Sequence, residues 1–292
     1  MNQNCKVAVL DSGIDSTFEN DKKVTMVGDC YDDNGHGTMC YSIIKRMAPE
    51  SEFEIHKILN SGLGASSERL IELLEDIYAK ETPNIIHMSL STSEVKYREK
   101  LRSVCKRLRE KGAVIVASSN NEEGVESFPC DFEEVIGVAG GFFDSDWKFE
   151  FNPLKKAQVI ANKVPVISRG LGGYYRFFGG TSKAAACITG ILASNWGAFD
   201  PEKVEIYMES LTSLTCTENR AEVVKDVYSY CVSKWNMLDG REFDPEAAFM
   251  ILMDFSTKFG VRIDPEGVML TDFDDPLELS KMLSAFMGER YA

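Results

Sequence analysis

Ser182 is the residue in this sequence best placed to act as a nucleophile. It follows two glycines that permit a tight turn, and it precedes small residues that begin a predicted helix. Serine is a weak nucleophile alone, so catalysis also requires a general base, a group that orients the base, and an oxyanion donor. The chemistry to look for elsewhere in the chain is therefore that of acyl transfer.

The general base can be narrowed down because the chain has only three histidines, His36, His56 and His87. His56 and His87 lie in alternating or apolar runs typical of strands, so we interpret both as packed or edge histidines. His36 instead lies between two glycines, just before a helical pattern at 39–47. That setting favours access over packing, and His36 is the candidate base.

Asp11 is the candidate for the orienting group. It ends the apolar run 7–10, and a carboxylate buried at a strand end is costly unless it has a hydrogen-bonding partner such as an imidazole. From Asp11 alone, a turn that simply ends the strand is an equally good interpretation.

Three segments match, in order, the three signatures of the subtilisin-like serine proteases, or subtilases. They are Asp11-Ser12-Gly13, Gly35-His36-Gly37-Thr38 and Gly180-Thr181-Ser182, and the resemblance covers roughly residues 5–200. It implies that Asp11 orients the base, that His36 acts as general base and then general acid, and that Ser182 forms an acyl-enzyme.

The same resemblance implies an oxyanion donor just after the predicted strand 113–118. Asn121 matches the asparagine of the Gly-Asn-Glu sequence in similar subtilases, and its side-chain amide would stabilise the developing alkoxide. If the register is shifted by one residue, Asn120 takes that role.

Substrate contacts are also implied by the resemblance. The substrate backbone is expected to add as a strand against 61–64 and 89–91, with contacts at Gly62, Gly64, Ser89, Leu90 and Ser91, and with Ser127 in the pocket floor. Ser91 replaces a glycine of the relatives and is expected to narrow the pocket. Glu126 either favours a polar or basic substrate side chain or is simply solvated.

Two residues near Ser182 depart from the family pattern. Lys183 stands in place of methionine and Ala186 in place of proline, but neither change removes a catalytic atom. We therefore expect a serine endopeptidase of narrow specificity that cleaves a peptide or protein precursor. The alternative is a pseudoprotease that binds a peptide or a partner without cleaving it. Asp11 lies almost at the start of the sequence, so no inhibitory propeptide is expected.

Strands and helices are predicted to alternate over residues 1–200, as in a parallel α/β sheet flanked by helices. The expected strands are 6–10, 52–59, 85–90, 113–118 and 135–139, and the expected helices are 37–47, 66–79, 94–111 and a last one from about 182 to 196. Active-site residues then lie at the carboxyl ends of strands and at helix starts.

Composition excludes several classes of protein. The net charge of −14 disfavours binding to nucleic acid or to anionic membranes, and no stretch is long and apolar enough to span a bilayer. The eight cysteines lack paired spacing, which indicates neither a zinc site nor a disulfide framework. We expect a cytosolic protein without a metal or other cofactor.

Residues 201–292 are expected to form a second, acidic, helical domain, and residues 1–200 to fold without it. The region has 9 basic and 18 acidic residues and three patterns of helical spacing, which suggest a small bundle. Its closing part, 249–283, resembles an acyl or peptidyl carrier protein, through residues 252–263 followed by an acidic turn and a last amphipathic helix. Pro245 of Asp244-Pro245-Glu246, however, replaces the serine that would carry phosphopantetheine. Either it docks a partner, with Asp272, Asp274 and Asp275 among its acidic residues, or it is a generic bundle that packs on the protease.

Overall fold

The computed structural model describes residues 4–120, 125–212, 227, 230, 231, 234, 245–273 and 276–287. The chain divides into two compact units. The first comprises 1–163, 169–174 and 178–215, and the second comprises 164–168, 175–177 and 216–292. The first unit therefore extends past the predicted boundary at residue 200, and two short segments of the second unit precede that boundary.

An eight-stranded sheet forms the centre of the first unit, in the order β2-β3-β1-β4-β5-β6-β8-β7. The strands are β1 (Lys6–Asp11), β2 (Val24–Met26), β3 (Glu52–Lys57), β4 (Ile85–Met88), β5 (Val114–Ser118), β6 (Ile136–Gly141), β7 (Phe149–Phe151) and β8 (Val159–Asn162). The pairings are parallel except that β7 pairs antiparallel with β8. The predicted parallel α/β sheet is confirmed.

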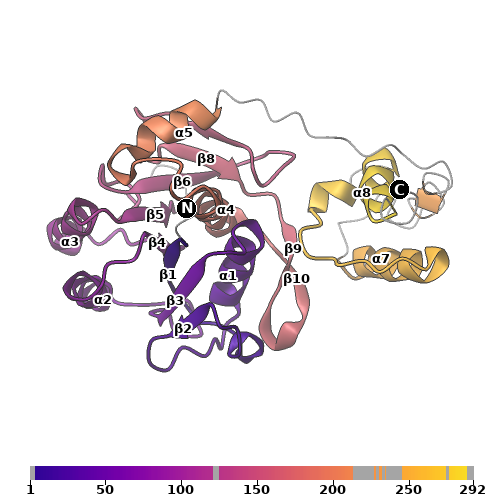
Figure 1. Cartoon of the computed structure of the whole chain (residues 1–292), viewed down its shortest axis with the longest axis horizontal. Coiled ribbons are helices and arrows are strands. Elements are labelled where there is room, and N and C mark those ends of the chain that lie inside the picture. The colour runs from indigo at the N-terminus through magenta and orange to yellow at the C-terminus, as the bar shows by residue number, and fades with distance from the viewer. Residues whose placement is uncertain are drawn as a thin grey trace. The chain divides into compact units, whose positions relative to one another are not determined.

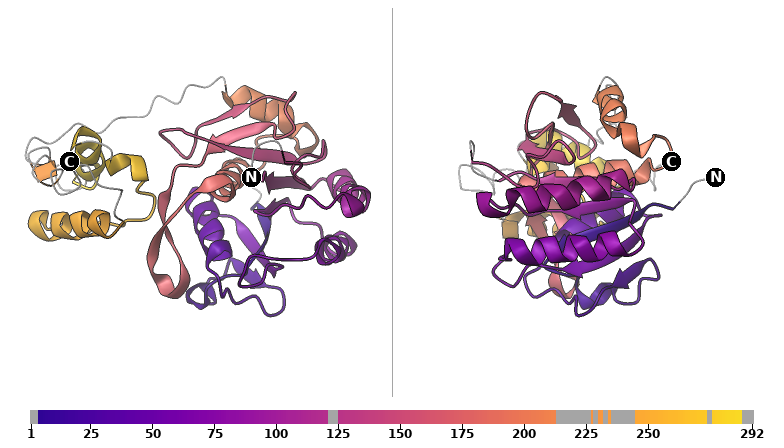
Figure 2. Two further views of the ribbon diagram at one scale, coloured as in Figure 1. Left: turned by 180° about the vertical axis from the view of Figure 1, so that it is seen from behind. Right: turned by 90° about the vertical axis from the view of Figure 1, so that its left-hand side faces the viewer.

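Four long helices cover the two faces of this sheet: α1 (His36–Met47), α2 (Ser67–Ala79), α3 (Arg98–Glu110) and α4 (Gly180–Ser194). Figure 1 shows α2 and α3 on one face and α1 and α4 on the other. The further views in Figure 2 also show α2 and α3 side by side. Short helical turns η1 (Ser16–Phe18), η2 (Val95–Tyr97) and η3 (Leu171–Gly173) lie in the connections.

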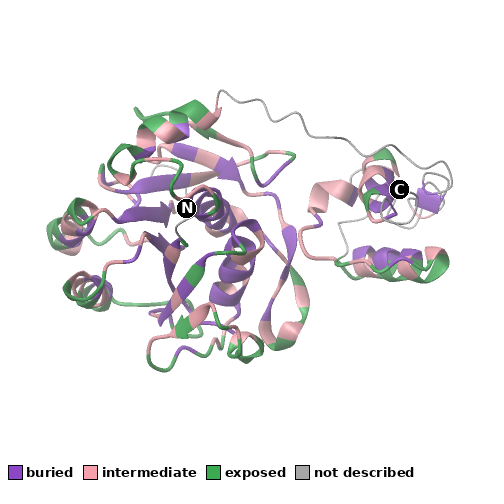
Figure 3. Ribbon diagram, in the orientation of Figure 1, coloured by how far each residue is buried: buried purple, intermediate pink, exposed green. Residues whose placement is uncertain are grey.

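Helix α2 illustrates how the sequence specifies these elements. The Ser66 hydroxyl caps its start by accepting a hydrogen bond from the Arg69 amide at 3.2 Å. Leu70, Leu74 and Ile77 recur at helical spacing and are buried against the sheet, whereas the opposite face of the helix is exposed (Figure 3).

The central strands are buried on both faces and therefore read as continuous apolar runs. Residues 7–11 of β1 and all of β4 and β5 are buried. Since β1, β4 and β5 are parallel neighbours in the order β1-β4-β5, their carboxyl ends meet at one edge of the sheet. Asp11 and Ser118 end β1 and β5 at this edge, and Ser89 follows β4 there.

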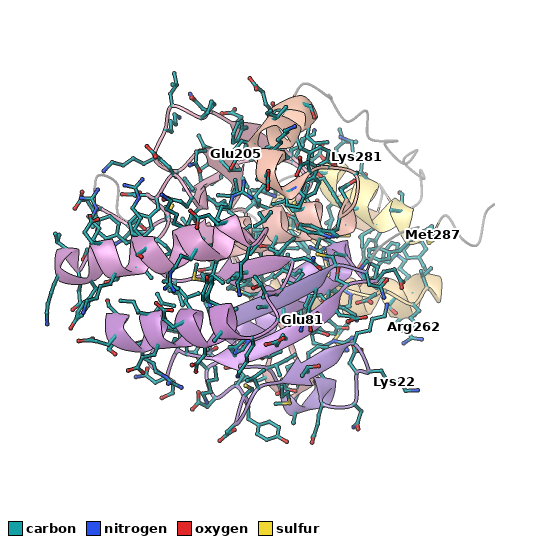
Figure 4. The ribbon with its side chains drawn as sticks, turned by 60° about the vertical axis from the view of Figure 1, so that its left-hand side comes forward. Lys22, Glu81, Glu205, Arg262, Lys281 and Met287 are labelled. Atoms are coloured by element: carbon teal, nitrogen blue, oxygen red, sulfur yellow. The ribbon has the colours of Figure 1, made fainter. Side chains whose placement is uncertain are left out.

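Residues beyond 200 also belong to the first unit. The turn η4 (Pro201–Lys203) leads into α5 (Val204–Thr212), in which Val204 and Met208 are fully buried. Glu205, labelled in Figure 4, accepts a hydrogen bond from Arg109 of α3 at 3.0 Å. The first unit thus gains both apolar burial and an ion pair from residues that the sequence assigned to the second domain.

The second unit contains helices and one strand pair. Among its described residues the helices are α7 (Pro245–Phe259), η5 (Leu270–Phe273) and α8 (Pro276–Ala285). The strand β9 (Val166–Arg169) pairs with β10 (Tyr175–Phe178), and both strands belong to this unit except for Arg169 and Phe178. Helix α7 begins at Pro245, a residue type well suited to the first position of a helix, whereas Asp244 lies outside the described residues. The hairpin was not predicted as part of this unit: the Ile167 amide donates to the Val268 carbonyl at 2.7 Å, and Ile167 lies in the apolar core with Leu252 and Phe255.

Within the described ranges, no helix combines the length and apolar character needed to cross a bilayer. Seven of the eight cysteines lie in the described part of the chain, where all seven are buried and none forms a disulfide. Cys216 falls outside it.

Candidate active site

Asp11 and His36 form a hydrogen-bonded pair at the carboxyl edge of the sheet. The Asp11 Oδ1 atom lies 2.7 Å from Nδ1 of His36 and also accepts a 2.7 Å hydrogen bond from the Ser12 amide. The Asp11 side chain is 1% exposed and that of His36 is 14% exposed. The carboxylate is therefore shielded from water, whereas one side of the imidazole faces the solvent.

Glycines permit the close approach of β1 and α1 that makes this pair possible. A Cβ atom added to Gly37 would lie 2.4 Å from the Gly13 carbonyl oxygen, which no side chain could tolerate. The Gly37 amide also donates to the Ser12 hydroxyl at 2.9 Å. Gly35 has a φ of 99°, in the region that favours glycine, and it turns the chain into the helix.

Asp32 holds the turn that precedes His36, a role that the sequence interpretation missed. Its carboxylate accepts hydrogen bonds from the amides of Asn34, Gly35 and Thr38 and from the Thr38 hydroxyl, at 2.6–3.0 Å. Burial would raise the pKa of Asp32, but these hydrogen bonds outweigh it and hold the pKa below its usual value. An acidic residue a few positions before a predicted helix was the available signal.

The pKa of His36 is raised above its ordinary value of 6.5. Burial would lower this pKa, but the negative charge of Asp11, the hydrogen bond that its carboxylate accepts from His36, and any negative charge on Cys40 act in the opposite direction and prevail. Because burial raises the pKa of the Cys40 thiol and keeps it neutral, we attribute the raised pKa of His36 to the Asp11 carboxylate.

Ser182 lies in the first turn of α4 and lines a cleft of about 440 Å³ together with His36. Gly180, the first residue of that helix, has a φ of 84°. The candidate nucleophile and base therefore open onto the same space, with the acid behind the base. Phe178 packs edge-on against the His36 ring, with the ring centroids 5.4 Å apart.

The cleft also contains most of the predicted substrate contacts. Gly64, Ser89, Leu90 and Ser91 line it. The Ser89 hydroxyl additionally donates to the Ser182 carbonyl at 3.2 Å. Gly62 is outside the described lining and lies in a turn where its amide donates to Asn60 at 2.9 Å.

The segment expected to supply the oxyanion donor is described only in part. Asn121 lies outside the described residues. Asn120 lines the cleft, and its amide donates to the Ser127 hydroxyl at 2.8 Å. Ser127 is buried and is not part of the described lining. Glu126 is also outside that lining, 3.9 Å from Lys156, so its carboxylate gives no support to a basic specificity pocket.

Lys183, which departs from the family pattern, is fully buried and forms an ion pair with Asp146. Asp146 also accepts hydrogen bonds from Arg46 at 2.7 Å and from the Asn162 amide nitrogen at 3.0 Å. Arg46 belongs to α1 and Lys183 to α4. The carboxylate thus joins the two helices whose first turns contain His36 and Ser182.

The other two histidines are buried and hydrogen-bonded. His56 lies 2.9 Å from the Glu54 carboxylate, and His87 lies 2.8 Å from each of two hydroxyls. Ligand-type atoms of Asp11, Cys40 and His87 approach within 4.8 Å of one another. Since both His87 ring nitrogens are engaged and Asp11 binds His36, this group is better described as polar packing than as a metal site.

The family match and the relatives found by comparison with known proteins agree with each other. The sequence matches the subtilase family over residues 2–224. It is 29% identical over 217 residues to "Intracellular serine protease" of Paenibacillus polymyxa, covering 64% of this chain and 65% of that protein. It is 27% identical over 219 residues to "Major intracellular serine protease" of Bacillus subtilis (strain 168), covering 65% and 68%. The chain thus spans just under two thirds of the Paenibacillus protein.

The fold gives the same result. The structure is similar to a cold-adapted subtilisin-like serine proteinase, with a TM-score of 0.58 and 16% identity, over 70% of this chain and 81% of that one. At this identity the likeness establishes a subtilisin-like fold. The family match ends at residue 224, so the resemblance of the C-terminal region to carrier proteins stays a prediction. From the sequence match and the shared fold, this chain belongs to the subtilase family.

Proposed function

We propose that this protein is an intracellular serine endopeptidase that cleaves a peptide or protein precursor through an acyl-enzyme. The observation that carries the proposal is the 2.7 Å hydrogen bond between Asp11 and His36 beside a cleft that Ser182 also lines. The names of the two bacterial relatives support both the reaction class and the location.

In the proposed reaction, the Ser182 hydroxyl attacks the scissile carbonyl carbon while His36 takes the hydroxyl proton on Nε2. Asp11 stabilises the imidazolium through its hydrogen bond to Nδ1. The tetrahedral intermediate then expels the amine, which receives the proton from His36. Water, activated by the same imidazole, attacks the acyl-enzyme and restores the free serine.

The cleft lining supports substrates with uncharged side chains near the scissile bond. Apart from His36, the described residues that line the cleft are apolar, small, hydroxyl-bearing or amide side chains, and none is acidic or basic. A charged substrate side chain would lose its hydration there without gaining an ion pair. This replaces the polar or basic preference that Glu126 suggested from the sequence. We propose narrow specificity, set by Leu63, Leu70 and Ser91 in the lining.

Labelling with a fluorophosphonate probe tests the proposed nucleophile. Ser182→Ala should abolish both labelling and cleavage of a peptide substrate, while circular dichroism stays unchanged, because the serine and histidine act as one unit. Ser194→Ala, at the exposed end of the same helix, is the matched control and should label normally. Labelling that persists in Ser182→Ala would exclude this serine. A wild type that binds peptide without labelling or cleavage would favour the pseudoprotease alternative.

We further propose that Asn121 donates to the oxyanion. Asn121→Ala should reduce kcat about 10²- to 10³-fold with little change in KM, since the hydrogen bond forms only as the alkoxide develops. Asn120→Ala is the matched comparison, because Asn120 lines the cleft. A larger loss of kcat in Asn120→Ala than in Asn121→Ala would assign the role to Asn120 instead.

A docking role for the acidic C-terminal region is a separate proposal that rests on its charge. If acidic side chains such as Asp272 meet a basic surface of the partner, salt should slow cleavage of the physiological substrate more than cleavage of a short peptide. Equal salt dependence for both substrates would argue against docking.

A further inference from the structure

His87 lies at the centre of the sheet, directly beneath the helix that contains Ser182. It belongs to β4, where it pairs in register with Val9 of β1 and Val116 of β5, and its side chain is fully buried. Its ring nitrogens face two hydroxyls: Nδ1 lies 2.8 Å from Thr189 Oγ1, and Nε2 lies 2.8 Å from Ser89 Oγ.

The hydrogen positions follow from counting donors. A serine hydroxyl has one hydrogen, and that of Ser89 is directed to the Ser182 carbonyl oxygen at 3.2 Å. Nε2 of His87 must therefore carry a hydrogen and donate it to Ser89, which leaves Nδ1 to accept from the Thr189 hydroxyl. We assign this neutral tautomer from the hydrogen-bond network. Burial, the main effect, lowers the pKa of His87 to about 4, so the ring is uncharged at neutral pH.

The resulting chain of hydrogen bonds begins and ends on α4. It runs from Thr189 through His87 and Ser89 to the backbone of Ser182, and seven residues correspond to about two helical turns. Both ends therefore lie on the same side of the helix, above the carboxyl end of β4. This series of hydrogen bonds fixes the first two turns of α4 against the sheet.

An apolar side chain could fill the same volume without requiring buried hydrogen-bond partners. A buried imidazole has two polar nitrogens that must each be satisfied, which constrains the orientation of its neighbours as well as its own. Here that constraint acts on Ser89, whose hydroxyl would otherwise be free to rotate away from the Ser182 carbonyl.

We propose that His87 is a positioning residue for Ser182: through Ser89 it holds the backbone of the nucleophile in register with His36. The proposal rests on the function proposed above, because positioning has a kinetic meaning only if Ser182 reacts. It assigns a role to a histidine that takes no direct part in proton transfer.

Three variants test the proposal in the full-length protein. Ser89→Ala removes the last link, His87→Leu removes both ring nitrogens, and His87→Gln retains an amide that can donate toward Ser89. We expect kcat per active site to fall about 10- to 100-fold in Ser89→Ala and His87→Leu with KM nearly unchanged, and to recover partly in His87→Gln. Active sites are counted with the fluorophosphonate probe, so that misfolded protein is excluded.

The double variant His87→Leu/Ser89→Ala distinguishes a connected chain from two separate packing effects. If His87 and Ser89 act through one connected series of hydrogen bonds, kcat of the double variant should be no lower than kcat of the more severe single variant. Losses that multiply, or variants that lower the melting temperature while kcat per active site is unchanged, would overturn the positioning role.

The tautomer provides a readout that does not depend on catalysis. The ¹⁵N shifts of His87 should show a neutral ring protonated on Nε2 at neutral pH. Protonation on Nδ1, or an imidazolium, would overturn the assigned chain even if the enzyme is active. If the wild type is not labelled at Ser182, the proposed function fails instead, whatever the state of His87.

Discussion

The hydrogen bond between Asp11 and His36 determines how the proposed base titrates. The Asp11 carboxylate is buried and stabilises the imidazolium, so the pKa of His36 lies above 6.5. Only the neutral imidazole can accept the serine proton. The form that cannot react therefore persists to higher pH than it would for an isolated histidine.

The pH dependence of the reaction follows from the raised pKa of His36. The rate of fluorophosphonate labelling should rise with pH and reach half its maximum above pH 6.5, and it should fall as acid protonates His36. Removing the carboxylate in Asp11→Asn should move the midpoint to lower pH in addition to slowing the reaction. A wild-type midpoint at or below 6.5, measured over about pH 5 to 10, would contradict the raised pKa of His36.

The sequence predicted those site residues that short local motifs identify. Asp11, His36 and Ser182 each belong to a short motif that contains glycine, and the structure brings Asp11 into contact with His36 and places Ser182 in the cleft that His36 lines. The prediction that His87 is a packed histidine is confirmed, since its side chain is fully buried, but the sequence could not indicate its hydrogen bond to Thr189, 102 positions away. A buried histidine in a strand looks the same in sequence whether its nitrogens satisfy packing or position a nucleophile.

At the scale of elements, the buried carboxylate of Asp146 connects α1 and α4. It has two cationic partners, Lys183 at 0% side-chain exposure and Arg46 at 28%. The two cations do not depend on it equally, because Arg46 can be hydrated in part whereas Lys183 cannot.

This asymmetry predicts a ranking of variants in urea unfolding. Asp146→Asn should lower the free energy of unfolding by about 3–5 kcal/mol, because it leaves the Lys183 charge buried without a partner. Lys183→Met should cost less, since Asp146 keeps its hydrogen bond to Arg46. The double variant Asp146→Asn/Lys183→Met should be more stable than Asp146→Asn alone. Strictly additive losses would show that the pair is not coupled.

Helices and strands were predicted correctly where the periodic pattern of apolar residues extends over many positions. The helices at 37–47 and 66–79 agree with α1 and α2 to within a residue, and five strands were found in order. Three strands of the sheet were missed: β2 and β7, which have three residues each, and β8, which has four, too few for a clear pattern of alternation. The predicted helix 94–111 begins instead with the turn η2 before α3.

At the scale of the whole molecule, the two compact units of the structure have other bounds than residue 200, where the change in charge predicts a domain boundary. Helix α5 contributes buried Val204 and Met208 to the first unit. Residues 164–168 contribute to the second unit, where Ile167 is fully buried. Composition detected a second region but could not detect that an earlier segment of the chain completes it.

Two truncations separate these contributions. A chain that ends at residue 200 should melt at a lower temperature than one that ends at 215, because it lacks α5 and the partner of Arg109. Both should be less soluble than the intact protein, since each leaves Ile167 without its apolar neighbours. Melting temperatures and soluble yields of the three chains provide the test. If the chain ending at 200 matched the intact protein in both, the sequence boundary would be the correct one.

The pairing of Ile167 with Val268 also sets an order of events during translation. About 100 residues separate these partners, so at about 5 to 20 residues per second the strand waits roughly 5 to 20 seconds for its partner to be synthesised. All segments of the first unit have by then left the peptidyl-transferase centre, since the last ends at residue 215. The second unit must therefore close after them, and a ribosome that stalls before codon 267 holds a chain in which β9 has no partner from the C-terminal region.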